Sequence, residues 1–450
     1  MSFDRRDFLR VAATVSAGAL ASGLNRGAMS QSSSLPNPGQ SGIEHVVVVM
    51  MENRSFDHLL GWLPNANGQQ AGLSYPDSGG NLHATSRLSY YVGCSHPDPD
   101  HSYSGGRTEY NGGLMDGWLR AGSNDSFSIG YYTEADVPLY ASLARNFTTL
   151  DHYFSSIMSS TFPNRVFQHA AQTDRLSNTL DISTLPTIWD SLQAAGVSHR
   201  YYYQNIPFLA LWGTKYLGIS ALYEQFKSDV ANGTLPAVTF VDPWYTVLDD
   251  GLGNDDHPHA DLRNGEIFLR DLVTTVTSSS LWANTVIVIN RDEWGGFFDH
   301  VAPPRAAAGN SVDTDLVDGK ALLGCRVPTI IVSPFARGNP SNPTINSLIY
   351  DHTSVLKLIE WRWGLAPLTA RDASSDVANL AYALNFAAPD TSVPSLPEIS
   401  KPAVDSCTFD DIIESIESGS SLGTVEAEAY DFFKMLESDL VNGWKVITNS

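Results

Sequence analysis

Cysteine is scarce in this chain of 450 residues, which contains only Cys94, Cys325 and Cys407. Three cysteines allow at most one disulfide bond and leave one thiol over, so a fold held by several disulfides is excluded. The sequence also lacks a CxxC pair and any cysteine–histidine spacing typical of a zinc finger. We therefore expect the cysteines to be structural or to have no role in the function.

Positive charge is scarce as well. The 27 Lys and Arg residues stand against 49 Asp and Glu residues, which gives a formal net charge of −22. Because such a surface repels phosphate backbones, nucleic acid is excluded as a partner of the whole molecule, and strong attraction to anionic lipid head groups is disfavoured. A substrate that carries phosphate would need a local positive centre, such as a metal ion, to be held.

Long hydrophobic runs are also missing, since no stretch of about 18 apolar residues is present and no transmembrane segment is expected. The apolar residues 11–24 are too few, and too rich in Ala, Gly and Ser, to span a membrane. They follow residues 5–10 (RRDFLR), and a twin arginine before x-Phe-Leu and a mildly hydrophobic stretch resembles a Tat export signal. We predict that residues 1–30 are this signal, that 31–42 are a linker, and that the protein is exported to the periplasm or the extracellular space.

Apolar residues are abundant, at 42% of the chain, which is enough for a large core. Continuous β-branched runs occur at residues 45–51, 237–241, 285–289 and 327–332, and such runs are typical of strands buried on both faces of a parallel sheet. Helical patterns, for example at residues 265–273, lie between them. The alternation predicts an α/β fold with a mostly parallel central sheet flanked by helices.

The domain organisation follows from the same patterns. We expect residues 43–450 to form a single α/β domain. Residues 64–124 are rich in Gly, Ser, Asn, Tyr and His and show no clear periodicity, so they predict a long loop-rich insertion of the kind that often carries function. Residues 424–441 have helical spacing and predict a packed C-terminal helical segment.

Acidic residues follow two of the predicted buried strands. Glu52 and Asn53 come directly after the first, and Asp292 and Glu293 come just after the third. In open α/β sheets ligands bind beyond the carboxyl ends of the strands, where carboxylates and an amide oxygen would suit a divalent cation. Acids at strand ends can also be helix caps or surface charges, but two such clusters at corresponding ends favour a metal site.

Four segments of the chain carry a family resemblance when taken together. Residues 52–58 (ENRSFDH), 161–165 (TFPNR), 254–258 (NDDHP) and 292–301 (DEWGGFFDHV) occur in the order in which they resemble the phosphoesterase family of non-specific phospholipases C and related acid phosphatases. Residues 203–207 (YQNIP) look more like the plant enzymes than the bacterial ones. The resemblance covers residues 43–366 and implies an alkaline-phosphatase-like α/β fold.

The resemblance also implies roles for individual residues. It places one divalent metal ion on Glu52, Asn53, Asp292 and Glu293, with Ca, Mg, Mn, Fe and Zn all open. It implies that Thr161 is the nucleophile, although a threonine in such a turn, taken alone, is more often a helix cap. The histidines it points to are His101 and His257 near the phosphate, and His300 and His352 in matching motifs, while Asn53 and Asn205 would contact the substrate. His96 and His259 are adjacent alternatives.

The expected function is therefore that of an exported, metal-dependent phosphoric ester hydrolase. A phospholipase C that releases diacylglycerol through a phosphothreonine intermediate is the leading hypothesis, with transient contact with a membrane surface. One alternative is an acid phosphatase that acts on soluble phosphomonoesters. Another is an exported protein that binds metal or phosphate without catalysis.

Overall fold

The computed structural model describes residues 34–246 and 253–402. The predicted export signal (1–30), the first residues of the predicted linker, the predicted C-terminal helical segment (424–441) and Cys407 lie outside these ranges. Cys94 is disulfide-bonded, and Cys325 is a buried free thiol. Among the described residues, no helix combines the length and the apolar character needed to cross a membrane.

The core of the fold is an eight-stranded sheet with the strand order β15-β6-β14-β10-β1-β9-β7-β8. The central strand β1 pairs in parallel with β10 and β9, and the pairs β9–β7, β7–β8 and β15–β6 are also parallel. All four strands predicted from the sequence are present, and the prediction of a mostly parallel central sheet is confirmed. The strands are β1 (His45–Met51), β6 (Thr148–Leu150), β7 (His199–Tyr203), β8 (Ser220–Leu222), β9 (Val238–Val241), β10 (Thr285–Arg291), β14 (Thr329–Val332) and β15 (Ile345–Asn346).

One predicted strand differs from the parallel pattern. β14 runs antiparallel to both of its neighbours, β10 and β6. A parallel return would need a crossover, usually a helix, but the described residues 292–328 form only loops and a small sheet of β11 (Arg305–Ala307), β12 (Leu316–Val317) and β13 (Lys320–Leu322). The chain therefore re-enters the main sheet from the end at which β10 leaves it.

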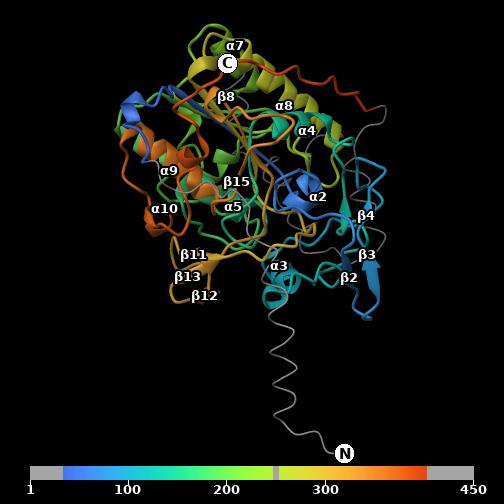
Figure 1. The fold of residues 1–450 in the computed structure, drawn as a ribbon. Helices are drawn as coiled ribbons and strands as arrows, with labels where there is room; N and C mark the ends of the chain where they lie inside the picture. The colour runs from blue at the N-terminus through green and yellow to red at the C-terminus, as the bar shows by residue number, and fades with distance from the viewer. Residues whose placement is uncertain (1–33, 247–252, 403–450) are drawn as a thin grey trace, which may run out of the picture. The chain divides into compact units, whose positions relative to one another are not determined.

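Helices cover both faces of the sheet. The side chains of β1 alternate between the two faces, and each face is apolar and packs against its own set of helices. Val46 and Val48 face a core that includes residues of α5 (Thr161–Ala170), α6 (Ile188–Ala194) and α9 (His352–Trp363). Val47 and Val49 face the other core, together with residues of α2 (Phe56–Leu60), α4 (Pro138–Asn146), α7 (Tyr223–Ala231) and α8 (Leu262–Thr277). The predicted helix at 265–273 lies within α8. Figure 1 shows α4 beside α8, and α9 beside the short α10 (Ala370–Ala373).

The predicted insertion, residues 64–124, contains more regular structure than its composition suggests. It forms β2 (Ser74–Pro76), β3 (Leu82–Ala84), β4 (Ser86–Arg87), the helix α3 (Tyr103–Tyr110) and the 3-10 turn η2 (Asn111–Gly113), and β4 pairs with β5 (Gly130–Tyr131). The insertion contributes Trp118 to a third, smaller core, which also includes Trp294 and Phe298. The other 3-10 turns of the described residues are η1 (Pro38–Gln40), η3 (Phe208–Trp212), η4 (Leu217–Ile219), η6 (Trp282–Asn284), η7 (Pro334–Ala336) and η8 (Leu380–Ala383).

Candidate active site

The pairing of β1 with β10 brings the two predicted acidic clusters together. Met51 stands opposite Arg291 in the parallel register, so Glu52 and Asp292 leave the sheet side by side. The Asp292 N–H donates to the Met51 carbonyl at 3.2 Å, and the Glu52 N–H donates to the carbonyl of Asp255 at 2.7 Å. Both acidic side chains are buried. The carboxyl ends of two central strands thus form the floor of the candidate site.

Asn53 turns back over this floor. Its backbone has a φ of 46°, and its N–H donates to Asp292 Oδ1 at 3.3 Å. The chain after Glu293 must pass close to it, because any side chain at Gly295, whose φ is 63°, would place its Cβ 2.2 Å from the Asn53 carbonyl oxygen. The Gly295 N–H in turn donates to Glu293 Oε2 at 2.6 Å. The glycine therefore allows Asn53 and Glu293 to lie against each other.

Two buried oxygens of this group have no hydrogen-bond partner among the described residues. They are Asn53 Oδ1 and Glu293 Oε1, whose residues are 1% and 0% exposed. A buried oxygen without a partner costs about 1–3 kcal/mol, more when it is charged. An amide oxygen and a carboxylate oxygen are ligands that hard divalent cations prefer. The residues predicted to hold a metal therefore fit one.

The electrostatics of the floor agree with a cation. Burial and the neighbouring Asp292 raise the pKa of Glu52 well above its usual range, and the same two causes raise the pKa of Glu293. Burial also raises the pKa of Asp292, against the effect of Arg165. Three buried carboxyl groups that resist losing their protons would be stabilised as carboxylates by a divalent positive charge.

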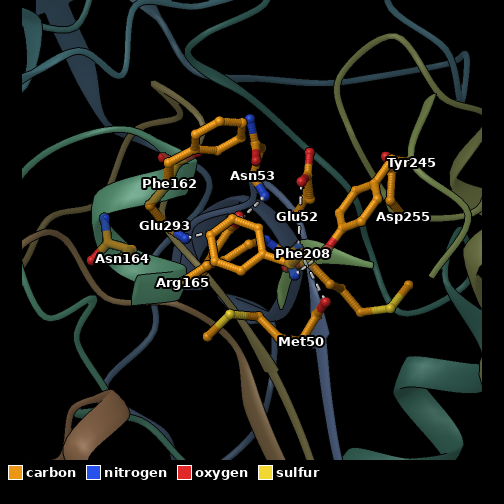
Figure 2. A network of polar contacts seen from close by, with 12 residues as sticks. Met50, Glu52, Asn53, Phe162, Asn164, Arg165, Phe208, Tyr245, Asp255 and Glu293 are labelled. Atoms are coloured by element: carbon orange, nitrogen blue, oxygen red, sulfur yellow. Dashed lines mark hydrogen bonds and ion pairs between the residues drawn. The ribbon is translucent and has the colours of Figure 1, made fainter. Parts of the chain in front are cut away.

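Arg165 joins helix α5 to this floor. Its guanidinium donates to Asp292 Oδ2 at 3.0 Å and to Glu52 Oε1 at 3.4 Å, and also to the carbonyl of Met50 at 3.1 Å (Figure 2). It donates to the hydroxyl of Tyr245 at 2.7 Å as well. The side chain is only 2% exposed and all of its nitrogens are engaged. Arg165 therefore positions other groups and has no donor left for a substrate.

Thr161 is the first residue of α5, four residues before Arg165. Residues four apart lie on the same face of a helix, so Thr161 is on the face of α5 that meets Glu52 and Asp292. Its N-cap, Ser160, makes no side-chain bond to the helix, and the Ser160 hydroxyl has no partner within the described part of the chain. One N–H at this end is in use, because the Phe162 N–H donates to Asn178 Oδ1 at 2.7 Å. The positive end of the helix dipole still lies beside the Thr161 hydroxyl, where it would favour a phosphate.

Two of the predicted histidines border the same group. His101 is 1% exposed, and its Nδ1 donates to the carbonyl of Pro99 at 2.7 Å. Its Nε2 accepts from Asn53 Nδ2 at 3.4 Å and lies 3.8 Å from Glu293 Oε1. His257 Nε2 lies 3.4 Å from Asp98 Oδ2. These rings add one proton acceptor and one possible cation to the site.

The charge of His257 is set by the acids around it. Burial opposes a charged ring, but the carboxylates of Asp98, Asp255 and Glu52 together raise the pKa of His257 to about 9. The backbone N–H of His259 approaches His257 Nδ1 at 3.2 Å, a contact that favours the neutral ring. The ion pair with Asp98 outweighs that single contact, so we take the imidazolium as the form at neutral pH.

His352 and Asn205 lie around the site and hold its parts in place. The capping box at Asp351 starts α9 and places His352 as its first residue, where Nε2 donates to the Asp292 carbonyl at 2.7 Å. Burial lowers the pKa of His352 to about 4, which keeps the ring neutral. Asn205 accepts from the Tyr245 N–H at 3.1 Å and donates to its carbonyl at 3.0 Å. Catalysis by His352 and substrate binding by Asn205 stay predictions.

His300 belongs to a different cluster. Its Nδ1 is 2.5 Å from Asp57 Oδ2, and ligand atoms of Asp57, Asp299 and His300 lie within 4.8 Å of one another. This spacing could suit a metal, but the fully buried Arg326 already donates to Asp299 Oδ1 at 2.9 Å and to Asp57 Oδ1 at 3.1 Å. The backbone N–H of Gln69 donates to Asp57 Oδ1, and the backbone N–H of Val301 donates to Asp299 Oδ1. Because Arg326 and these N–H groups already satisfy the oxygens of this cluster, the unpartnered oxygens of Asn53 and Glu293 fit a metal ion better.

Sequence reasoning did not assign roles to several residues that organise the site. Arg165 belongs to the 161–165 segment of the family resemblance. Its spacing of four residues from Thr161 predicts that the two side chains lie on the same face of a helix. Asp98, whose pKa is lowered by His257 against the effect of burial, stands three residues before His101. No pattern in the sequence could pair it with His257, because that contact joins segments about 160 residues apart.

Comparison with known proteins gives a consistent result. A model of the Phosphoesterase family matches residues 43–366. Non-specific phospholipase C6 of Arabidopsis thaliana is 34% identical over 378 residues, which cover 74% of this chain and 71% of that protein. Phospholipase C B of Mycobacterium tuberculosis is 32% identical over 474 residues, which cover 88% of each chain. A protein in the alkaline phosphatase superfamily from Vibrio parahaemolyticus, of known structure, is 11% identical and covers 98% of this chain and 97% of that one, with a TM-score of 0.36 that is too low to carry an argument about the site.

Proposed function

Because the chain belongs to the phosphoesterase family and is a phosphoric ester hydrolase, we propose that it is a metal-dependent phospholipase C that cleaves the glycerol–phosphate bond of phospholipids. The observation that carries this proposal is the pair of unpartnered buried oxygens, Asn53 Oδ1 and Glu293 Oε1, on a floor that α5 reaches through Arg165. A cation held by Glu52, Asn53, Asp292 and Glu293 would supply charge to phosphoryl oxygens and lower the pKa of a nearby hydroxyl.

In the proposed reaction Thr161 is the nucleophile. Its Oγ1 forms a bond to phosphorus in line with the bond that breaks, which joins phosphorus to the glycerol oxygen. The Thr161 hydroxyl proton goes to His101 Nε2, and the His257 imidazolium gives a proton to the departing glycerol oxygen. Diacylglycerol leaves, and a phosphothreonine carrying the head group remains.

The second step regenerates the enzyme. Water attacks phosphorus and gives a proton to His257, and the bond from phosphorus to Thr161 Oγ1 breaks while His101 returns its proton to that oxygen. The products are phosphorylated head group and free Thr161. The two rings thus exchange one proton each, and both end in the state in which they began.

The relatives favour a lipid as the substrate, since the curated proteins that match at 31–34% identity are phospholipases C. We expect purified, metal-loaded protein to release diacylglycerol from a short-chain phosphatidylcholine, kept below its micelle concentration, with a kcat/KM about 100-fold or more above that for p-nitrophenyl phosphate. Product analysis by mass spectrometry measures both. A preference for the monoester would make the protein a phosphatase, and turnover of neither would make it a binding protein.

We also propose that the protein is exported through its twin arginine. The RRDFLR segment supports this, and so does the disulfide at Cys94, since such bonds persist in oxidising compartments. Replacing both Arg5 and Arg6 by Lys is expected to leave the protein inside the cytoplasm, as measured by cell fractionation, while a control with Arg26 replaced by Lys is exported. Equal export of both variants would contradict the proposal.

A further inference from the structure

Three chain excursions near the candidate site share one base. They are the β2–β3 hairpin, the turn that follows α3, and the β12–β13 hairpin, and they contribute Tyr75, Met115 and Leu322 to the third apolar core. That core also contains Trp294, the residue after Glu293, and Met158, three residues before Thr161. The excursions are therefore fixed to the part of the molecule that carries the catalytic groups.

Polar contacts hold the excursions to one another. Asp77 forms an isolated β-bridge with Leu119, which links the first hairpin to the chain after α3. The Tyr103 hydroxyl of α3 donates to Asp313 Oδ1 at 2.7 Å, and Arg107 pairs with Asp315 at 3.2 Å, just before β12. In Figure 1, β3, α3 and β12 lie along the lower side of the view. We call their turns the three tips.

Each tip exposes aliphatic side chains. Leu82 at the first is 72% exposed, Leu114 at the second is 70% exposed, and Leu316 and Val317 at the third are 41% and 51% exposed. Scattered exposed leucines are ordinary, but here four of the exposed large apolar residues of the described chain stand at turns that share one base. Apolar groups presented at loop tips beside a lipid-cleaving site are suited to enter a bilayer.

The charges near the tips select the kind of membrane. Asp77, Asp116 and Asp318 lie close to the exposed aliphatic residues in sequence. The basic side chains near them already have acidic partners, since His83 pairs with Asp77 at 2.9 Å, Arg120 with Asp116 at 2.6 Å and Lys320 with Asp376 at 2.5 Å. With a net charge of −22 as well, strong electrostatic attraction of the protein to anionic lipids is disfavoured. A zwitterionic surface, such as that of phosphatidylcholine, would not repel these acids, so apolar insertion alone can drive binding.

We propose that the three tips form a docking surface for a zwitterionic lipid bilayer, into which Leu82, Leu114 and Val317 insert. The proposal deepens the phospholipase C function and rests on it for its biological meaning, but docking and hydrolysis can be measured separately.

The test uses co-sedimentation of the full chain with sucrose-loaded phosphatidylcholine vesicles, in a Thr161→Ala background that leaves the lipid intact. Replacing Leu82, Leu114 and Val317 together by Ser is expected to weaken partitioning by about ten-fold or more. The matched control replaces Ile182, Leu222 and Val393 by Ser, which are exposed by 50%, 37% and 45% but belong to no tip, and it is expected to bind like the parent. High salt should not weaken binding.

A second measurement follows the insertion of one tip into the bilayer directly. An environment-sensitive fluorophore on Leu114→Cys is expected to shift to the blue on vesicles, whereas one on Ile182→Cys is not. With Thr161 restored, the tip variant should hydrolyse monomeric short-chain phosphatidylcholine at the parent rate. Equal loss in both triple variants, an unshifted probe at position 114, or preference for anionic vesicles would overturn the docking surface. Absence of hydrolysis with intact docking would instead count against the proposed function alone.

Discussion

Replacing Thr161 by alanine is expected to lower kcat/KM for short-chain phosphatidylcholine by about 10⁴-fold or more, because no other group can form the phosphothreonine. The fold should survive. The segment before α5 is held by Asn164, whose Nδ2 donates to the carbonyls of Ile157 at 3.1 Å and Ser159 at 2.7 Å, and α5 itself is held by Arg165. Neither contact uses the Thr161 side chain, so we expect a loss of about 1 kcal/mol or less in the free energy of unfolding.

Two further variants separate chemistry from shape. Thr161→Val keeps the shape of the side chain without its hydroxyl and should be as inactive as Thr161→Ala. Thr161→Ser restores a hydroxyl and should recover most of the activity. Rapid quenching followed by mass spectrometry is expected to find the phosphorylated head group on residue 161 in the parent. Substantial turnover by the valine variant would mean that water attacks phosphorus directly.

The floor of the site could be predicted from the sequence for a simple reason. The β-branched runs at 45–51 and 285–289 predict buried strands of a parallel sheet. When two such strands are parallel neighbours, the acids that directly follow them lie at the same edge of the sheet. The direction of 327–332 could not be predicted in this way. A β-branched run indicates burial on both faces but not orientation, which the connection from β10 decides.

Helix α3 escaped prediction because its sequence, YSGGRTEY, has two glycines in its first half. The chain packs closely at both of them, since a Cβ at Gly105 would lie 2.2 Å from Asp100 Oδ1, and a Cβ at Gly106 would lie 2.6 Å from Met158 and 2.8 Å from Trp294. Close packing of α3 against the core next to Glu293 therefore overrides helix propensity.

The four histidines show a second limit of prediction from sequence. His101, His257, His300 and His352 all stand in matching motifs, yet each meets a different partner: the Pro99 carbonyl, Asp98, Asp57 and the Asp292 carbonyl. The hydrogen-bond or ion-pair partner of each ring decides whether the ring faces a ligand, carries a charge or holds a neighbouring residue in place. Such partners are set by tertiary contacts between distant segments.

Removing the metal is expected to destabilise the protein strongly at pH 8 and weakly at pH 5. In the metal-free fold, the raised pKa values of Glu52, Asp292 and Glu293 keep protons on groups that the unfolded chain, with carboxyl pKa values of about 4, has already lost. This contribution is complete at low pH and is lost as the pH rises through the folded-state pKa values. A metal needs the deprotonated ligands, so its stabilisation grows over the same range.

The measurement is the difference in melting temperature between metal-loaded and chelator-treated protein. At pH 8, with metal at about 100 times its Kd, we expect about 2.7 kcal/mol of stabilisation, or roughly 3 °C for a domain of this size, and a much smaller difference at pH 5. His352 and His169, whose pKa values burial lowers to about 4 and about 3, favour the fold at higher pH, but they do so in both forms and cancel in the difference.

An Asp→Asn substitution in each of the two acidic clusters, at Asp292 in one and at Asp299 in the other, tests which cluster binds the metal. Asp292→Asn should reduce the pH-dependent difference and the measured metal affinity, because it removes one of the buried carboxylates beside Asn53 Oδ1. Asp299→Asn lowers stability by weakening the contact with Arg326, yet it should leave metal affinity unchanged. If Asp299→Asn abolished metal binding and Asp292→Asn did not, the cation would belong to Asp57, Asp299 and His300, and the oxygens of Asn53 and Glu293 would need another partner.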